Sequence, residues 1–305
     1  MIVITAPSIH ADAVQALADY RLVFCAANSS EEELARICEQ NRPLAIMVRY
    51  GNISSAVIAA AGPQLQVIAK HGVGIDNIDA AYAAACRIPV LAAPGSNSQA
   101  VAELAIGLLM ACARRLVWLD GRMRQGHWDK DSYDGIELAG RTLGLIGYGA
   151  IGQRVGAIAI ALGMRVQVFD PHAIKAALPA SITSAGLDEL LRTSDAISLH
   201  CPLNPDTRHL INAERLAVMK AGAILINTAR AGLIHEPALL VALHARHLWA
   251  GLDCFAQEPV APDHPLALAP QTVLTPHIGG SSDAAYRQMG VSAATNILKV
   301  LQVGP

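Results

Sequence analysis

Residues 141–170 constrain the fold of this chain more than any other segment. Their sequence, RTLGLIGYGAIGQRVGAIAIALGMRVQVFD, opens with an apolar run, Leu143–Ile146, that is too short for a helix and is typical of a buried strand. Apolar residues then recur at helical spacing at Ile151, Val155, Ile158 and Leu162. Gly163 ends this helix, and Arg165–Phe169 predicts a second strand. The segment therefore predicts a strand, a glycine turn, a helix and a strand, as in a βαβ unit.

The turn of this unit carries three glycines in the pattern G-x-G-x-x-G, at Gly147, Gly149 and Gly152. The first permits a tight turn, the second lets the backbone approach a pyrophosphate, and the third lets the helix pack closely on its strand. The helix N-terminus offers unpaired N–H groups to phosphates. Asp170 ends the second strand and can bind ribose hydroxyls. These features predict a dinucleotide site, and the carboxylate favours NAD over NADP because it repels a 2′-phosphate.

Composition narrows the class of protein. A chain of 305 residues is long enough for two domains, and 53% hydrophobic with 16% charged residues fits a compact α/β enzyme. The net charge of −2 gives no reason to expect nucleic acid or an anionic membrane as a partner. The six cysteines include no C-x-x-C, so we expect buried thiols in a reducing cytoplasm and neither a disulfide framework nor a metal site. We expect no signal peptide and no transmembrane segment.

The first ninety-odd residues predict a small parallel α/β unit without a glycine phosphate loop. Short apolar, β-branched runs predict strands at Ile2–Thr5, Leu22–Cys25, Ala45–Val48, Val67–Ala69 and Val90–Ala92. Helices are expected at Ala11–Tyr20, Ser30–Asn41 and Ile53–Ala60. Ser30 and Glu33 form a capping box for the second of them.

A long apolar helix is expected at 98–118, followed by an irregular connection at 119–140. Further strands are predicted at Ala196–His200, Ala223–Asn227, Trp249–Asp253 and Thr272–Leu274, and a final helix at Asp283–Leu301. Because no strand follows this last helix, it can pack back on the N-terminal unit. The prediction is a discontinuous domain, 1–97 plus 282–305, flanking a continuous one, 98–281. The alternative is two sequential domains, with the last helix on the dinucleotide domain.

Four polar residues follow predicted strands, at the edge where open parallel sheets bind ligands. They are Arg230, Asp253, Glu258 and His277. Reduction of a 2-keto acid needs a proton donor for the carbonyl oxygen, a cation for the carboxylate and an acid that orients the donor. His277, Arg230 and Glu258 match these needs in turn. The remaining histidines except His71 are expected to be exposed or helical: His10, His127, His200, His209, His235, His244, His247 and His264.

The chain resembles the D-isomer-specific 2-hydroxyacid dehydrogenase family over nearly its whole length, and within it the phosphoglycerate dehydrogenase branch without the regulatory domains. The motifs that carry the likeness are KHGVGIDNID at 70–79, APGSN at 93–97, GYGAIG at 147–152, HCPL at 200–203, NTARAG at 227–232, LDCFAQEP at 252–259 and TPHIGG at 275–280. The resemblance implies two Rossmann-like parallel-sheet domains with the active cleft between them. It also implies a homodimer in which the 119–140 region reaches across.

The resemblance also implies the roles of individual residues. His277 would be the acid/base, paired with Glu258, and Arg230 would bind the substrate carboxylate with the backbone N–H groups of Val73 and Gly74. Arg49 and Asn97 would complete the substrate site. The residues implied for NAD are Gly147, Tyr148, Gly149, Ala150, Ile151, Gly152, Asp170, Cys201, Pro202, Thr207, Thr228, Ala229, Asp253 and Gly279.

Two departures from the family pattern bear on the substrate. Ala231 separates Arg230 from Gly232. Tyr50 follows Arg49 where small hydroxyl residues are common, so Tyr50 is either a specificity residue or a packed side chain, and Arg49 is the candidate partner for a substrate phosphate. The hypothesis is an NAD-dependent D-2-hydroxyacid dehydrogenase acting on a small 2-keto or 2-hydroxy acid. Glyoxylate or hydroxypyruvate reduction remains open beside phosphoglycerate oxidation. A non-catalytic NADH-sensing corepressor-type protein is the rival from another class, and a formate enzyme of the same fold is less favoured.

Overall fold

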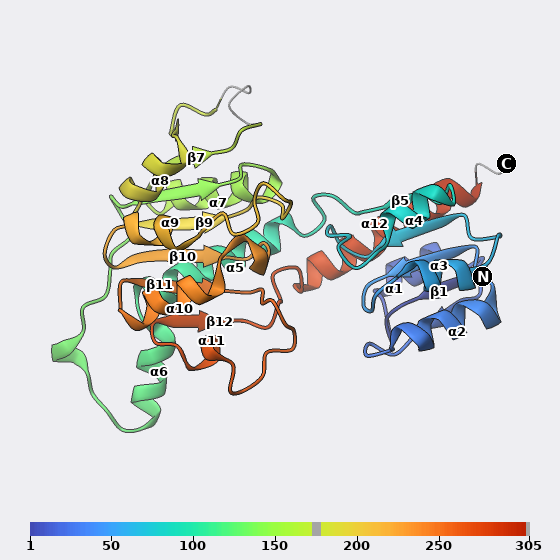
Figure 1. Ribbon diagram of the computed structural model, residues 1–305, viewed down its shortest axis with the longest axis horizontal. Helices are drawn as coiled ribbons and strands as arrows, with labels where there is room; N and C mark the ends of the chain where they lie inside the picture. The colour runs from blue at the N-terminus through green and yellow to red at the C-terminus, as the bar shows by residue number, and fades with distance from the viewer. Residues whose placement is uncertain (173–177, 303–305) are drawn as a thin grey trace. The chain divides into compact units, whose positions relative to one another are not determined.

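The computed structural model describes residues 1–172 and 178–302, which form two compact units (Figure 1). Unit 1 comprises Met1–Asn97 and the chain from Gly280 onward, and unit 2 comprises Ser98–Gly279. The return to unit 1 falls after Gly279, two residues before the boundary predicted at 281. Each unit has its own parallel sheet with helices on both faces.

The sheet of unit 1 has five parallel strands in the order β2-β1-β3-β4-β5. The strands are β1 (Ile2–Ile4), β2 (Leu22–Phe24), β3 (Ala45–Val48), β4 (Val67–Lys70) and β5 (Val90–Leu91). β1 and β3 are buried along their whole length, which explains their uninterrupted apolar sequences. The chain winds outward in opposite directions from β1 and β3, so the topological switch point lies between them.

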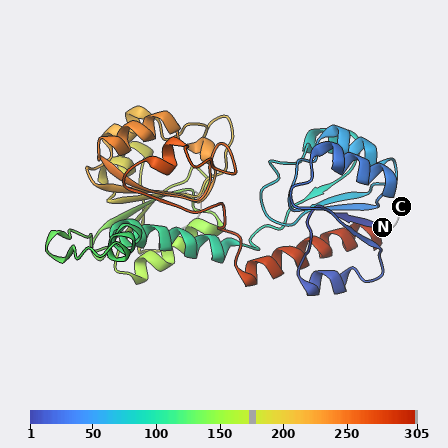
Figure 2. The ribbon, with the colours of Figure 1, turned by 90° about the horizontal axis from the view of Figure 1, so that it is seen from below.

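Two helices cover one face of this sheet and three cover the other (Figure 2). The first pair is α1 (Ala11–Ala16) and α12 (Asp283–Gln302), and the others are α2 (Glu31–Asn41), α3 (Ser55–Ala61) and α4 (Ala80–Ala85). The last helix of the chain thus packs on unit 1. The helix predicted to reach Tyr20 is wrong in extent, because it ends at Ala16 and a turn leads into β2. Within the described residues, no helix has both the length and the apolar character needed to cross a bilayer.

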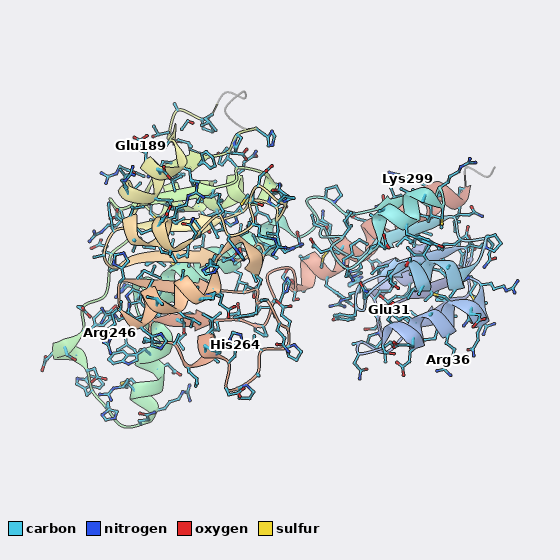
Figure 3. The ribbon with its side chains drawn as sticks, viewed as in Figure 1. Glu31, Arg36, Glu189, Arg246, His264 and Lys299 are labelled. Carbon is cyan, nitrogen blue, oxygen red and sulfur yellow. The ribbon has the colours of Figure 1, made fainter. Side chains whose placement is uncertain are left out.

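Helix α2 illustrates how local sequence sets the ends and faces of an element. The capping box is confirmed: the Glu33 N–H donates to Ser30 Oγ at 3.2 Å, and the Ser30 N–H donates to Glu33 Oε2 at 3.1 Å. Leu34 of this helix is buried. The labelled Glu31 and Arg36 lie at the outer surface of the unit (Figure 3). This division between faces docks the helix on the sheet.

The sheet of unit 2 has seven parallel strands in the order β12-β11-β10-β9-β6-β7-β8. The strands are β6 (Thr142–Ile146), β7 (Arg165–Phe169), β8 (Ile182–Ser184), β9 (Ala196–Leu199), β10 (Ala223–Asn227), β11 (Leu248–Leu252) and β12 (Thr272–Leu274). Strand β8 was not predicted from the sequence, because this short edge strand buries only Ile182 and lacks an apolar run. The switch point of this sheet lies between β6 and β9.

Helices α5 (Ser98–Ala113) and α7 (Ala150–Ala161) pack on one face of this sheet, and α8 (Leu187–Thr193), α9 (Ala213–Val218) and α10 (Glu236–His244) on the other (Figure 2). The described residues also form the helical segments α6 (Leu116–Arg124), α11 (Pro265–Leu268) and the 3-10 turns η1 (Lys130–Ser132) and η3 (Ala231–Leu233).

The single helix predicted at 98–118 is wrong. Helix α5 ends at Ala113, and Arg115 adopts a left-handed conformation with φ +52°. A second helix, α6, then starts at Leu116 and continues to Arg124, inside the segment expected to be irregular. Tertiary contacts hold the break, since the Arg115 guanidinium pairs with Asp134 and lies 5.0 Å from the ring centre of Trp249. Apolar residues continue on both sides of the break, so the sequence pattern did not indicate it.

The six cysteines differ in burial, whereas the sequence predicted that all would be buried. All six are free, and four are buried, but Cys86 is exposed at the end of α4 and Cys201 is half-buried after β9. Burial raises the pKa of the Cys112 thiol to about 12, so this side chain behaves as a small apolar group.

Gly251→Ala is expected to lower the free energy of unfolding of unit 2 by about 1–3 kcal/mol through overpacking. A Cβ at this position of β11 would lie 2.7 Å from Ile226 Cδ1 and 3.0 Å from Leu108 Cβ. Gly107→Ala is the matched control, because among the described residues nothing lies within 4 Å of its added Cβ in α5. This change is expected to raise stability by up to about 1 kcal/mol through helix propensity.

The measurement is urea unfolding followed by tryptophan fluorescence. All three tryptophans, Trp118, Trp128 and Trp249, lie in unit 2, so the signal reports this unit. Equal effects of the two substitutions would contradict the packing described for β11.

Candidate active site

The glycine turn after β6 brings three backbone segments together. Gly147 has φ +94°, and a Cβ there would lie 2.6 Å from the carbonyl carbon of His200. A Cβ at Gly152 would lie 2.3 Å from the Gly147 carbonyl oxygen, so the first turn of α7 packs directly on the turn. Around Gly149, by contrast, the described residues leave open space. The turn therefore has a tight interior and an open outer side at the start of α7, which fits a pyrophosphate.

Asp170, at the end of β7, braces this turn. Its Oδ2 accepts a hydrogen bond of 2.7 Å from the Tyr148 N–H, and its Oδ1 accepts one of 2.8 Å from the His172 N–H. The carboxylate thus fixes the glycine turn and places negative charge beside it. This arrangement fits a cofactor with a free ribose hydroxyl better than one with a 2′-phosphate.

His200, which follows β9, lies under the glycine turn, and the expectation that it is exposed or helical is wrong. The residue is half-buried; Nε2 lies 2.8 Å from Ser198 Oγ, and Nδ1 is buried and has no partner in the described part of the chain. Burial lowers the pKa of His200 to about 4, so the ring is neutral near pH 7. The backbone of the glycine turn lies directly against His200.

Cys201 directly follows His200 at the carboxyl end of β9. Burial raises the pKa of its thiol to about 11. The following loop is closed by Thr207, whose Oγ1 donates to the Pro202 carbonyl at 2.7 Å. Among the residues assigned to NAD by resemblance, Cys201, Pro202 and Thr207 therefore form one loop at the switch point.

The segment after β10 is held by a buried amide. Asn227 is 1% exposed; its Nδ2 donates to the Arg230 carbonyl at 2.9 Å, and its Oδ1 accepts the Ala229 N–H at 3.0 Å. The Arg230 Nη1 donates to the Ala229 carbonyl at 2.7 Å. Thr228 Oγ1 is buried and has no partner among the residues described. Asn227 thereby fixes the backbone from which Arg230 extends.

A buried carboxylate, Asp253, controls the loop after β12. It is 1% exposed and accepts hydrogen bonds from Thr275 Oγ1 at 2.6 Å, the Ile278 N–H at 2.9 Å and the Gly279 N–H at 2.8 Å. These donors flank His277, which adopts a left-handed conformation with φ +53°. The hydrogen bonds to Asp253 compensate for this uncommon backbone conformation.

Glu258 and His277 form a close, half-exposed pair. His277 Nδ1 lies 2.8 Å from Glu258 Oε2 and 3.0 Å from Oε1, and Oε1 also accepts the Phe255 N–H at 3.0 Å. The side chains are 50% and 37% exposed. Because Nδ1 faces the carboxylate, Nε2 is the ring atom left for proton exchange.

Unit 1 also has polar groups that could bind a ligand. Within residues 1–172 and 178–302, the backbone N–H groups of Val73 and Gly74 donate no hydrogen bond. Asn97 Oδ1 is buried without a partner in the same ranges. Arg49 directly follows β3, at the switch point of this sheet. Free backbone donors next to a fixed cation are suited to bind a small anion.

The structure thus brings Arg230, Asp253, Glu258 and His277 to one edge of unit 2, because β10, β11 and β12 are parallel neighbours. The supporting residues Asn227 and Thr275 were missed by the sequence reading. Both are polar residues at or just after the end of an apolar run, and this position could have indicated a role at the sheet edge. The sequence pattern does not indicate which groups they bond to.

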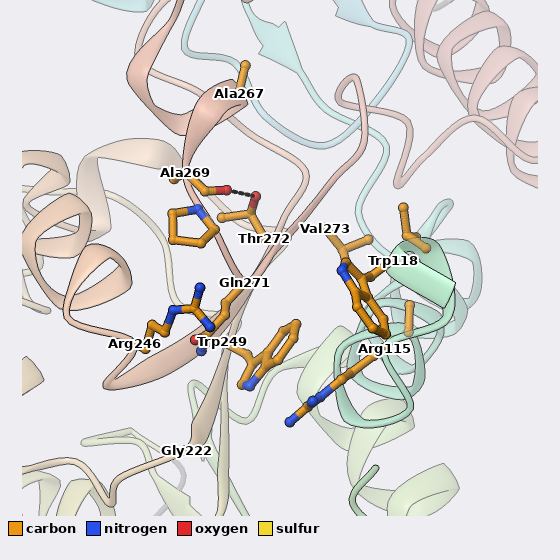
Figure 4. A pocket seen from close by; sticks show the side chains of 13 residues that line it. Arg115, Trp118, Gly222, Arg246, Trp249, Ala267, Ala269, Gln271, Thr272 and Val273 are labelled. Carbon is orange, nitrogen blue, oxygen red and sulfur yellow. Dashed lines mark hydrogen bonds between the residues drawn. The ribbon is translucent and has the colours of Figure 1, made fainter. Parts of the chain in front are cut away.

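A cavity of about 750 Å³ lies at the opposite edge of unit 2 (Figure 4). Gly222, Arg246 and Gln271, which precede β10, β11 and β12, help to line it. Arg115, Trp118 and Trp249 project into it. Glu258 and His277, in contrast, follow the carboxyl ends of β11 and β12. In the described part of the chain, no group of three or more histidine, cysteine or acidic side chains is arranged to hold a metal ion.

Comparison with known proteins identifies relatives of the whole chain. Residues 106–279 match the family model described as D-isomer specific 2-hydroxyacid dehydrogenase, NAD binding domain. The chain is 42% identical to a hydroxypyruvate reductase of Thermotoga maritima, over 85% of each protein. It is 38% identical to a D-3-phosphoglycerate dehydrogenase of Methanocaldococcus jannaschii, over 99% of this chain but 57% of that protein. The chain therefore spans little more than half the length of that second relative.

A solved structure extends the likeness to three dimensions. The crystal structure of the TT0316 protein from Thermus thermophilus superposes with a TM-score of 0.90 at 37% identity, covering 99% of this chain and 97% of that one. The prediction of two Rossmann-like parallel-sheet domains is confirmed by this match and by the two sheets.

His200→Gln is expected to make the stability of unit 2 less dependent on pH. The folded pKa of His200 is about 4 against an ordinary value of 6.5, so between these pH values the unfolded state binds more protons. The free energy of unfolding therefore falls as the pH is lowered through this range, by about 3 kcal/mol in total. Urea titrations at pH 7 and pH 4, followed by tryptophan fluorescence, should show this loss reduced in the variant. His209→Gln, at an exposed site, is the control, and identical losses in all three proteins would refute the assignment.

Proposed function

The chain belongs to the D-isomer-specific 2-hydroxyacid dehydrogenases, and we propose that it interconverts a small 2-keto acid and its D-2-hydroxy acid, with His277 as the acid/base. Its family consists of NAD-dependent oxidoreductases that act on the CH–OH group of hydroxy acids. The observation that carries the proposal is the 2.8 Å contact between His277 Nδ1 and Glu258 Oε2.

In the direction of reduction, His277 Nε2 donates a proton to the carbonyl oxygen of the keto acid, and in oxidation it accepts the hydroxyl proton. Glu258 accepts the Nδ1–H, which fixes the ring orientation and stabilises the imidazolium. Asp253 holds the His277 loop through the Thr275 hydroxyl before His277 and the Ile278 and Gly279 N–H groups after it, and is a positioning residue.

We assign the substrate carboxylate to the Arg230 guanidinium and the backbone N–H groups of Val73 and Gly74. A guanidinium and backbone donors together match the planar carboxylate with directed hydrogen bonds. Asn97 and Arg49 are assigned to the rest of the substrate.

The residues proposed to hold NAD are those of the glycine turn (147–152), Asp170, the Cys201–Thr207 loop, Thr228, Ala229, Asp253 and Gly279. Three observations support this assignment: the open space at Gly149, the Asp170 carboxylate that holds the turn, and Thr228 Oγ1, which has no partner among the described residues. The bound nicotinamide supplies or accepts the hydride. Asp253 accepts three hydrogen bonds from the His277 loop, and we assign it to the nicotinamide end through that loop.

Two substrate assignments are supported by particular relatives. The likeness to phosphoglycerate dehydrogenases favours a phosphoglycerate dehydrogenase-like reaction. The hydroxypyruvate reductase that matches over 85% of both chains favours hydroxypyruvate or glyoxylate reduction. Purified protein with NADH and a panel of 2-keto acids decides between them.

His277→Asn is expected to lower kcat for the preferred keto acid at least about 100-fold, because the proton donor is lost. Binding of NADH, followed by its fluorescence, is expected to persist. Glu258→Gln should lower kcat less, since the imidazole remains. His264→Asn is a matched control: His264 faces Glu236 at 3.5 Å in the same unit, and asparagine can still cap α11.

An unimpaired His277→Asn enzyme would overturn the assignment of the acid/base. Tight NADH binding without turnover of any keto acid would instead support an NADH-sensing protein. If only His264→Asn lost activity, His277 would not be the acid/base.

We further propose a cytoplasmic homodimer formed through α6 and the following segment. None of the nine residues of α6 is buried. Apolar side chains are exposed along this region at Leu116, Val117, Trp118, Met123 and Trp128. The cavity between α6 and the sheet adds an unfilled groove (Figure 4). A second copy, related by a two-fold axis, would cover these groups.

Val117→Asp is expected to raise the dissociation constant of this dimer at least about tenfold, because it places an unpaired charge in an apolar interface. Sedimentation velocity across a range of concentrations measures this shift. Val241→Asp, at an exposed position of α10, is the control and should leave the mass unchanged. A monomeric wild-type protein, or equal behaviour of both variants, would contradict the proposal.

A further inference from the structure

The loop that follows β3 in unit 1 is fixed to the end of β1. Thr5 Oγ1 accepts the Arg49 N–H at 3.0 Å and donates to the Tyr50 carbonyl at 2.6 Å. The Tyr50 N–H donates to the Thr5 carbonyl at 3.0 Å. Three hydrogen bonds thus set the backbone of Arg49 at the switch point between β1 and β3, where open parallel sheets bind ligands.

The Arg49 side chain is held by two aromatic rings. Its guanidinium carbon lies 4.8 Å from the ring centre of Tyr50 and 4.5 Å from that of Tyr286, a residue in the first turn of α12. Both distances suit cation–π contact. Throughout residues 1–172 and 178–302, Arg49 has no carboxylate partner. Arg49 is therefore a half-buried, positioned cation whose charge no acidic group of this unit neutralises.

The histidine next to this cation is neutral near pH 7. His71, 4% exposed, lies against Tyr286 with ring centres 5.4 Å apart, and neither of its ring nitrogens has a partner in the residues described. Burial, with Arg49 and Lys70 nearby, lowers the pKa of His71 to about 4. Lys70 Nζ donates to Asn77 Oδ1 at 2.6 Å. The neutral His71 ring thus supports Tyr286 from the sheet side.

Arg49 is also close in the fold to the free backbone donors of unit 1. β3 and β4 are parallel neighbours, so Arg49 and the Val73–Gly74 turn follow adjacent strands at one sheet edge. If the turn binds the substrate carboxylate, as proposed above, the cation lies beside it for a second negative group.

We propose that Tyr286 is a specificity-determining positioning residue: together with Tyr50 it holds Arg49 to receive a second oxyanion of the substrate, and so selects 2-keto acids with a terminal carboxylate, sulfonate or phosphate. This inference rests on the proposed function. The rings restrict the guanidinium before substrate binds, which reduces the entropy lost on binding, and its N–H edge stays available for bidentate contact.

The test compares kcat/KM for oxaloacetate, sulfopyruvate and phosphohydroxypyruvate with that for hydroxypyruvate. In the wild type, at least one of the three acids with a second anion is expected to exceed hydroxypyruvate. Tyr286→Leu should lower that preference about tenfold through KM, with kcat less affected, because the cation–π contact is lost. Tyr286→Phe keeps the ring and should keep the preference. Tyr82→Leu, at a tyrosine on α4 of the same unit, is the matched control.

The identity of the favoured acid distinguishes the three oxyanions. An equal fall for all substrates in Tyr286→Leu would indicate a structural role and overturn the inference, as would a wild type that prefers hydroxypyruvate. If the wild type reduces none of the four acids, the proposed function fails as well. Tyr50→Leu provides a second variant, expected to change the preference in the same direction.

Discussion

The organisation of this protein depends on parallel strand pairing. Every strand pair in both sheets is parallel, so each helix returns the chain to the same sheet edge before the next strand begins. Within each sheet, the carboxyl ends of the strands therefore meet at the opposite edge. In unit 1, Arg49 follows β3 at this edge. In unit 2, the polar residues and the glycine turn lie there: Gly147 after β6, Asp170 after β7, Arg230 after β10, Asp253 after β11 and His277 after β12. Parallel pairing thus brings residues of one unit that are far apart in sequence to the same edge.

Within that edge, buried polar groups fix the loops and exposed groups face solvent. Asp253 and Asn227 are each 1% exposed and use their oxygen and nitrogen atoms on backbone partners. The Glu258–His277 pair, in contrast, is about half exposed. A buried polar atom without a partner costs free energy, so these hydrogen-bonded side chains stabilise single loop conformations. The same division holds in unit 1, where Thr5 fixes the loop that carries Arg49.

Local rules predicted part of this arrangement well. The glycine turn, the capping box at Ser30 and most strands were evident from spacing, because each depends on neighbours a few residues away. The break at Arg115 and the burial of His200 were not. Arg115 is held by Asp134 and Trp249, and His200 by a turn fifty residues earlier, so no local pattern records either. Tyr286 was missed because an aromatic residue in a helix predicts packing and does not name its partner.

The sequence motifs indicated the family. Hydrophobic period and glycine spacing indicated the two α/β units and the polar residues that follow each strand, since these patterns act over a single turn or strand. How those residues are used was set by the tertiary structure. It joined the last helix to the first sheet, which brings Tyr286 to Arg49 across more than two hundred residues. It also buries Asp253, whose carboxylate accepts hydrogen bonds from the His277 loop. The reason is that hydrogen bonds and ring contacts depend on distance in space, and the sheet register sets that distance independently of separation along the chain.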